Sequence, residues 1–150
     1  MSDPLRALSP LDGRYADAGA PLAEYFSEFA FLRERVRVEL DFLALLSDTG
    51  LVRPLSDSET SLLQSIPSNF SILEAESIQS YERETRHDVK AIEYYLKNKL
   101  QETAVSDLLP WIHFGLTSED VNNVAQAIAF RDSRDRVLLP ARLELPFLSL

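Results

Sequence analysis

The stretch that decides the fold is residues 24–46, EYFSEFAFLRERVRVELDFLALL. Its large apolar residues recur at steps of three and four, which places them on one face of an α-helix, whereas Glu34 and Arg35 fall on the other face. The apolar positions are Tyr25, Phe26, Phe29, Leu32, Val36, Leu40, Leu43 and Leu46. We therefore predict one long amphipathic helix here, which ends near Gly50 because glycine readily adopts the left-handed conformation of a helix end.

Further helices are indicated by residues that begin and end them. Ser56 followed by Glu59 is a capping box, in which each side chain can bond the backbone N–H of the other, and Pro67 marks the end of that helix. We expect further helices over residues 71–84, 88–101, 106–114 and from 117 onward. Pro110 is tolerated only in the first turn of its helix, which Gly115 ends. Because no segment shows the alternating pattern of a strand, we predict an all-α fold.

The N-terminal segment has the composition of an irregular arm. A Pro-Leu-Asp-Gly run at residues 10–13 is typical of turns. We therefore expect the arm to extend from Met1 to about Pro21. It carries Arg14 and Tyr15, a pair that suits a phosphate together with a ribose or a ring face. The alternative is a flexible leader whose tyrosine packs on the first helix.

The C-terminal segment is expected to be irregular as well, because Pro140 and Pro146 interrupt it. Residues 143–150 are rich in large apolar side chains, which are costly to expose to water. We therefore expect this tail to be covered by further chain or by a partner.

Composition restricts the classes of function. The 150 residues suffice for one domain at most, and the net charge of −9 opposes general binding to nucleic acid. The chain has no cysteines, which excludes disulfides and thiolate sites, and its histidines and carboxylates lack the spacing of metal ligands. It shows no signal peptide and no run of about 20 apolar residues that could span a bilayer. We expect a soluble cytoplasmic protein without a metal and without membrane contact.

Arg86, His87 and Asp88 form the first candidate site, at the start of the predicted helix over residues 88–101. A histidine can exchange a proton near neutral pH, an arginine offers a fork of donors to a phosphate or carboxylate, and the aspartate can cap the helix. The alternative is a charged helix junction on the surface, which is the commoner origin of such a triplet.

Thr117 and Ser118 form the second candidate site, directly after Gly115. Free backbone N–H groups at a helix start favour an anion, and the two hydroxyl groups add further donors. The alternative is an ordinary helix cap. His113 lies among large apolar neighbours, so we predict a packed core histidine and assign it no role in ligand binding.

Three strings occur in this order along the chain: SPLDGRY at 9–15, TRHDVKAIEYYL at 85–96 and IHFGLTSEDVNN at 112–123. Together they resemble the N-terminal region of the adenylosuccinate lyases of bacterial purine biosynthesis, which belong to the fumarase/aspartase superfamily. The resemblance implies an N-terminal helical domain with the irregular arm over residues 1–110, and the start of the central long-helix bundle over residues 111–150. It also implies a homotetramer whose sites are shared between subunits.

The same resemblance implies a lyase without a cofactor. Such an enzyme releases fumarate by β-elimination from adenylosuccinate, giving AMP, and from the succinyl-aminoimidazole carboxamide ribonucleotide. The substrate-binding residues that it implies are Arg14, Tyr15, Arg86, His87, Asp88, Thr117 and Ser118. The first two would grip the nucleotide, the middle three would line the succinyl and phosphate region, and the last two would hold a carboxylate.

The resemblance places the general-acid histidine and the general-base serine of this family beyond Leu150. We therefore expect this chain to be an N-terminal fragment that contains no catalytic residue and is inactive alone. Two alternatives stay open. One is another lyase of the superfamily, such as argininosuccinate lyase, and the other is a non-catalytic helical interaction module whose tail at 143–150 docks onto another protein.

Overall fold

The computed structural model describes residues 4–144, and all regular structure within this range is helical, which confirms the predicted all-α fold. Residues 145–150, most of the predicted apolar tail, lie outside the described range. The elements are η1 (Pro4–Arg6), α1 (Ala16–Phe26), α2 (Glu28–Asp48), α3 (Asp57–Ser68), α4 (Ile72–Thr85), α5 (Asp88–Leu100), η2 (Ser106–Trp111), α6 (Ser118–Ser133), η3 (Arg134–Leu138) and α7 (Leu139–Glu144).

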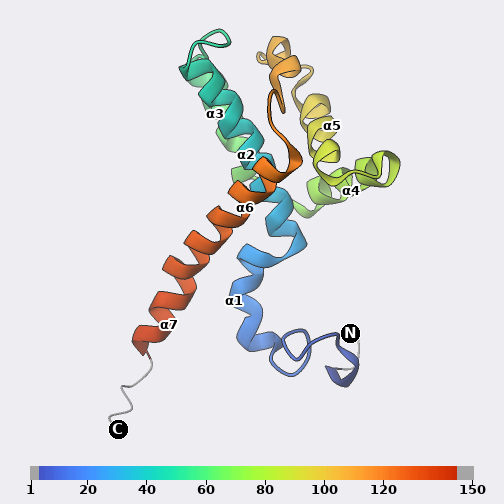
Figure 1. Cartoon of the computed structure of the whole chain (residues 1–150), viewed down its shortest axis with the longest axis vertical. Helices are drawn as coiled ribbons and strands as arrows, with labels where there is room; N and C mark the ends of the chain where they lie inside the picture. Colours follow the sequence, from blue (N-terminus) through green and yellow to red (C-terminus); the bar gives the residue numbers. More distant parts are fainter. Residues whose placement is uncertain (1–3, 145–150) are drawn as a thin grey trace.

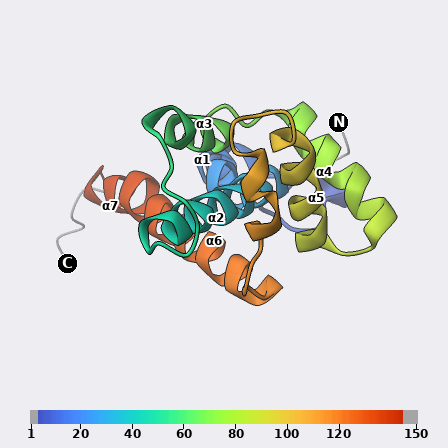
Figure 2. The same ribbon diagram turned by 90° about the horizontal axis from the view of Figure 1, so that it is seen from above.

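Helix α2 is the axis of the fold, because α1, α3, α4, α5 and α6 all pack against it. Seen from above, α2 lies in the middle, with α3, α6 and the α4–α5 pair around it (Figure 2). Figure 1 shows that α6 begins beside α2 and runs away from it, continuing through η3 into α7 as one long rod. The starts of α5 and α6, which carry the two candidate sites, therefore both lie near α2.

Two groups of buried apolar side chains hold the helices to α2. The larger group joins α2 to α3, α4 and α5 through residues such as Leu40, Ile78 and Leu96. The smaller group consists of Val38, Val89, Val121 and Ala125. Since Val89 lies in the first turn of α5 and Val121 in that of α6, this second group fixes both helix starts against α2.

The prediction of a single helix over residues 24–46 is wrong, because the chain breaks at Ser27. That residue is extended, with φ −70° and ψ 160°, and its hydroxyl accepts a hydrogen bond from the Ala30 N–H at 3.2 Å, so it caps α2. The arm is also shorter than predicted. Helix α1 begins at Ala16 and accommodates Pro21, since its alanine-rich sequence favours a helix and none of its residues is buried.

Two further predictions near prolines are wrong in detail. The predicted helix over residues 106–114 is the short 3-10 helix η2, in which Pro110 lies near the end rather than in the first turn. Pro140 does not interrupt the last helix within the described range. The chain passes through the π-helical turn η3, where the Leu139 N–H reaches back to the Arg134 carbonyl, and Pro140 then falls in the first turn of α7, where a missing N–H is tolerated.

Arg53 ties the start of α3 to η2. Its guanidinium donates to the Glu59 carboxylate at 2.8 Å and 3.1 Å and to the Asp107 carboxylate at 2.7 Å and 2.8 Å. Glu59 also completes the predicted capping box with Ser56, which the structure confirms. The hydrogen bonds from Arg53 and from the Ser56 N–H and hydroxyl lower the pKa of Glu59 to about 2.

The Glu59 carboxylate makes stability depend on pH. The pKa of Glu59 is lower in the folded chain than in the unfolded chain. Its contribution to stability is therefore fully present when the pH is above the ordinary pKa of a glutamate, and it is lost as the pH falls towards 2. We expect Arg53→Gln to lower the free energy of unfolding at neutral pH. We also expect the free energy of unfolding of this variant to decrease less than that of the native chain as the pH falls. Urea denaturation followed by circular dichroism across this pH range measures both effects.

Arg83→Gln is the matched control, because Arg83 makes no ion pair within residues 4–144 and should leave the acid profile unchanged. If the stability of Arg53→Gln fell with decreasing pH in parallel with that of the native chain, the role given to the Arg53–Glu59 ion pair would be contradicted.

Candidate functional site

The Thr85–Asp88 junction turns the chain sharply between α4 and α5. Arg86 ends α4 in the left-handed conformation with φ 52°, and the next residue, His87, is extended and caps α5. The His87 Nδ1 accepts a hydrogen bond from the Lys90 N–H at 3.2 Å. Since this nitrogen serves as an acceptor, the proton of the neutral ring is carried by Nε2, which is left as a donor on a side chain that is 53% exposed.

Asp88 points back into the fold and meets Arg35 of α2. The Arg35 Nη2 donates to the Asp88 Oδ2 at 2.5 Å, and its Nε donates to the Asn122 Oδ1 at 2.9 Å. The guanidinium also lies 4.0 Å from the centre of the Phe31 ring. One buried guanidinium on α2 therefore connects the first residue of α5 to the first turns of α6.

Electrostatics keep Asp88 ionised. Burial opposes its charge, but the Val89 N–H and the Arg35 guanidinium outweigh this effect and hold the pKa of Asp88 below its ordinary value. The Asp88 carboxylate is thus occupied by the fold. Of the Arg86–Asp88 triplet, Asp88 is the member that positions the junction, whereas His87 and Arg86 keep donors without a partner within the described residues.

Thr117 and Ser118 differ as Asp88 and His87 do: the fold uses the side chain of Thr117 and leaves that of Ser118 without a partner in the described part of the chain. The Thr117 hydroxyl accepts from the Asp120 N–H at 3.4 Å, while the Asp120 carboxylate accepts from the Thr117 N–H at 2.7 Å and from its hydroxyl at 2.9 Å. This capping box begins α6. Within the described part of the chain the Ser118 hydroxyl makes no hydrogen bond, so it is the available donor at this helix start.

His113 is not the packed core residue that its neighbours suggested. Its side chain is 21% exposed, and its backbone is left-handed, with φ 63°. Its Nδ1 lies 2.6 Å from the Oε1 of Glu39, a residue of α2 whose side chain is fully buried. Sequence reasoning missed both Arg35 and Glu39. Arg35 falls on the charged face of the predicted helix, and Glu39 lies on its apolar stripe but belongs to no motif.

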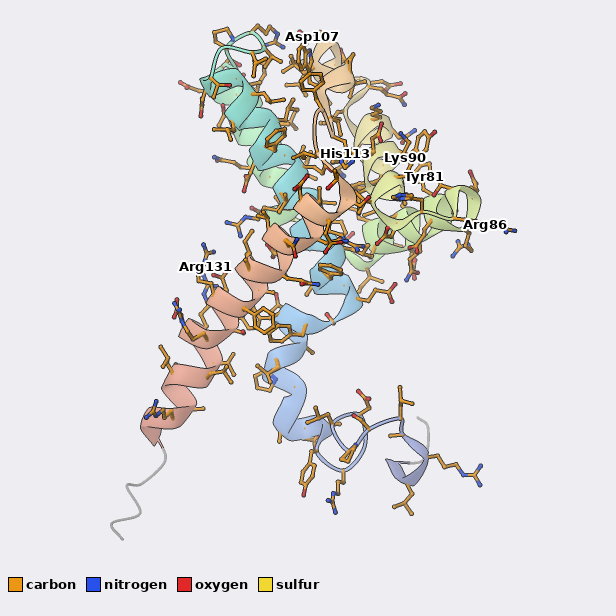
Figure 3. The ribbon with its side chains drawn as sticks, in the orientation of Figure 1. Tyr81, Arg86, Lys90, Asp107, His113 and Arg131 are labelled. Carbon is orange, nitrogen blue, oxygen red and sulfur yellow. The ribbon has the colours of Figure 1, made fainter. Side chains whose placement is uncertain are left out.

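The structure brings some of the predicted residues together and leaves others apart. The Arg35 contacts place the α5 start, with His87 and Asp88, beside the α6 start, with Thr117 and Ser118, as the long-range hydrogen bonds show. Figure 3 shows Arg86 at the outer corner between α4 and α5, away from the other labelled side chains.

Arg14 and Tyr15 are not joined to this group within the single chain. The Arg14 guanidinium lies 4.6 Å from the centre of the Tyr15 ring, and Tyr15 is about half exposed. Figure 1 shows their arm at the far end of α1, well separated from the α4–α5 corner.

A hollow of about 600 Å³ lies elsewhere, between α1, α2, α3 and α6. It is lined by paired charges such as Arg33 with Glu34, and none of the predicted substrate-binding residues lines it. The candidate site therefore lies outside this hollow, at two helix starts. Within residues 4–144 no group of histidines and carboxylates is arranged to hold a metal ion, and no helix is both long and apolar enough to cross a bilayer.

The described residues thus form a helical fold with polar groups gathered at two helix starts, and comparison with known proteins shows what the chain is similar to. The chain is 45% identical over 140 residues to adenylosuccinate lyase of Haemophilus influenzae, a match that covers 91% of this chain and 31% of that protein. It is 41% identical over 145 residues to the adenylosuccinate lyase of Legionella pneumophila strain Corby, covering 94% and 32%. The corresponding values for the Escherichia coli K12 protein are 41% over 143 residues, 91% and 31%.

The chain is therefore related in sequence to the adenylosuccinate lyases, as its three strings predicted. No protein-family model matches the sequence. The chain spans about a third of the length of the curated relatives that it matches. The roles of individual residues stay predictions.

The Arg35 contacts can be tested by stability. We expect Arg35→Met to lower the free energy of unfolding by about 1–3 kcal/mol, because the Asp88 carboxylate and the Asn122 amide lose a buried charged partner. Urea denaturation measures this change. Arg37→Met is the control on the same helix, since Arg37 is more exposed and its ion pairs are 3.5 Å long, and it should change stability by less than about 0.5 kcal/mol.

Urea denaturation should also distinguish the structural hydroxyl group of Thr117 from the hydroxyl group of Ser118. Thr117→Ala removes the cap of α6 and is expected to cost about 1 kcal/mol. Ser118→Ala removes a hydroxyl group without a partner in the described structure and should leave stability within about 0.5 kcal/mol. Equal losses in the two variants would show that Ser118 is as structural as Thr117.

Proposed function

We propose that this chain supplies part of the substrate site of an adenylosuccinate lyase. The reaction is β-elimination of fumarate from adenylosuccinate, giving AMP, and from the succinyl-aminoimidazole carboxamide ribonucleotide. One observation carries the proposal: the Arg35 contacts hold two helix starts together, and each start has one polar group that the fold does not use, the His87 Nε2 and the Ser118 hydroxyl. The sequence similarity to adenylosuccinate lyases over 91% of the chain supports it.

The chemistry of β-elimination explains why such groups are needed. Removing a proton from the carbon beside a carboxylate builds negative charge on that carboxylate, so donors placed around it in advance lower the barrier. The first backbone N–H groups of α6 and the Ser118 hydroxyl suit one succinyl carboxylate. The His87 Nε2 and the Arg86 guanidinium suit the remaining succinyl and phosphate oxygens. Thr117 and Asp88 position these groups through the cap of α6 and through Arg35.

Arg14 and Tyr15 enter the proposal through a second subunit. Because one chain leaves their arm far from the two helix starts, we propose that they grip the nucleotide in the site of a neighbouring subunit of a homotetramer. The general-acid histidine and general-base serine would come from sequence that this chain does not include, so we propose that the isolated chain does not turn over substrate.

The remaining parts of the proposal rest on the sequence alone. They are a cytoplasmic location, a division into residues 1–110 and 111–150, and no binding to nucleic acid or membrane. The predicted boundary falls within η2. The rival interaction module would use the tail at 143–150, most of which lies outside the described residues.

A chimera tests the proposed activity. The chain is joined to the rest of the Haemophilus influenzae adenylosuccinate lyase in place of the segment it matches, and fumarate release from adenylosuccinate is measured. We expect activity from the chimera and none from the chain alone. Ser118→Ala should lower kcat/KM about a hundredfold through loss of one donor to the developing charge.

Ser61→Ala is the matched control, since Ser61 is an exposed residue of α3 whose hydroxyl donates to the Asp57 carbonyl, and it should leave activity unchanged. A folded tetrameric chimera that releases no fumarate would refute the proposal. A chimera that releases fumarate from argininosuccinate instead would favour the other lyase of the superfamily.

A further inference from the structure

Glu39 is a buried carboxylate at the centre of α2 that the proposed mechanism does not use. Its side chain is fully buried, and only its Oε1 has a partner, the His113 Nδ1 at 2.6 Å. Its Oε2 is buried without a hydrogen bond within the described residues. Burial raises the pKa of Glu39, and the hydrogen bond with His113 opposes that shift without cancelling it. A carboxylate in this setting lowers stability compared with a neutral group of the same shape.

The partner of Glu39 is also held in an unfavourable state. His113 has the left-handed backbone with φ 63°, which a residue other than glycine adopts at a conformational cost. Strained residues persist where the surrounding structure holds them, and they concentrate at functional sites. The same contact thus combines a half-satisfied buried charge with a strained backbone, and stability alone explains neither.

The contact determines which nitrogen of His113 is available. Since an ionised Glu39 can only accept, the Nδ1 carries the proton and the Nε2 is the free nitrogen of the ring. His87 shows the opposite arrangement, because its Nδ1 accepts from the Lys90 N–H. With Glu39 ionised, the two contacts therefore favour opposite tautomers in the two histidines.

His113 lies four residues before Thr117, the N-cap of α6, and its charge interaction with Asp120 contributes to the lowered pKa of that carboxyl. Figure 3 places it on the segment that descends from η2 to α6. Glu93 of α5 also acts on the pair, since its charge raises the pKa of Glu39. Glu93 is itself paired at 2.7 Å with both Lys90 and Lys97. The ionisable groups around the imidazole are thus Glu39 from α2, Glu93 with its lysines from α5, and Asp120 from α6.

We propose that Glu39 is a positioning residue, which fixes the His113 ring with a protonated Nδ1 and presents Nε2 beside the α6 helix start where the substrate binds. This inference rests on the proposed function for the identity of the substrate. Glu39 itself touches no substrate, because it is fully buried beneath His113. A buried acid that orients a histidine and selects its tautomer can govern activity without taking part in the reaction, as in hydrolase triads.

Nitrogen-15 NMR of the 150-residue chain tests the geometry without any variant. The chain has only two histidines, so its imidazole spectrum contains two patterns. At a pH where both rings are neutral, we expect the Nε2–H form for His87 and the Nδ1–H form for His113. Two Nε2–H patterns would overturn the inference. In Glu39→Gln the His113 preference should be lost while the His87 pattern persists.

Glu39→Gln in the chimera tests the consequence for activity. We expect kcat to fall about tenfold or more and its pH profile to shift, while the melting temperature stays the same or rises because a buried charge has been removed. Glu34→Gln is the matched control, since Glu34 is also buried on α2 but pairs with Arg33, and it should keep the native kcat and pH profile.

The outcomes separate the two proposals. Native kcat and pH profile in Glu39→Gln would refute the positioning role while the activity of the parent chimera still supports the proposed function. An inactive but folded parent chimera would refute the proposed function, and the NMR spectra would then decide the Glu39–His113 geometry on their own.

Discussion

The candidate site depends on two hydrogen bonds that the buried Arg35 guanidinium donates, one to Asp88 and one to Asn122. They hold the first residue of α5 and the first turns of α6 against α2, although these segments are far apart in sequence. The apolar group of Val38, Val89, Val121 and Ala125 packs at the same crossing. Apolar packing thus brings the helices together, and one charged side chain fixes how their starts face each other.

In each of the two polar motifs, one residue stabilises the fold and its neighbour is available for binding. Asp88 and Thr117 are used by the fold, the first by Arg35 and the second by the capping box of α6. His87 and Ser118 keep a donor free beside them. Binding groups next to satisfied positioning groups are held rigidly, because the fold limits the motion of the backbone that carries them.

Helix α2 shows how a surface-like pattern can hide an interior one. Arg35 falls on the charged face of the predicted helix, yet it is buried, because α6 covers that face as well. Glu39 lies on the apolar stripe, three residues after Val36 and four before Leu43, where a carboxylate is not expected, and it is buried too. Each is tolerated there only through long-range partners, Asp88 and Asn122 for Arg35 and His113 for Glu39. Those partners come from other parts of the chain, which a periodic pattern in one segment does not reveal.

The sequence by itself determined the all-α class, the capping box at Ser56, the cap at Thr117 and the helix starts that carry His87 and Ser118, because caps and periodicity are local properties. Only the tertiary structure decided the break at Ser27, the burial of Arg35 and Glu39 and the left-handed turn at His113. Each of these depends on contacts between distant segments, and the energy of such contacts overrides local preference.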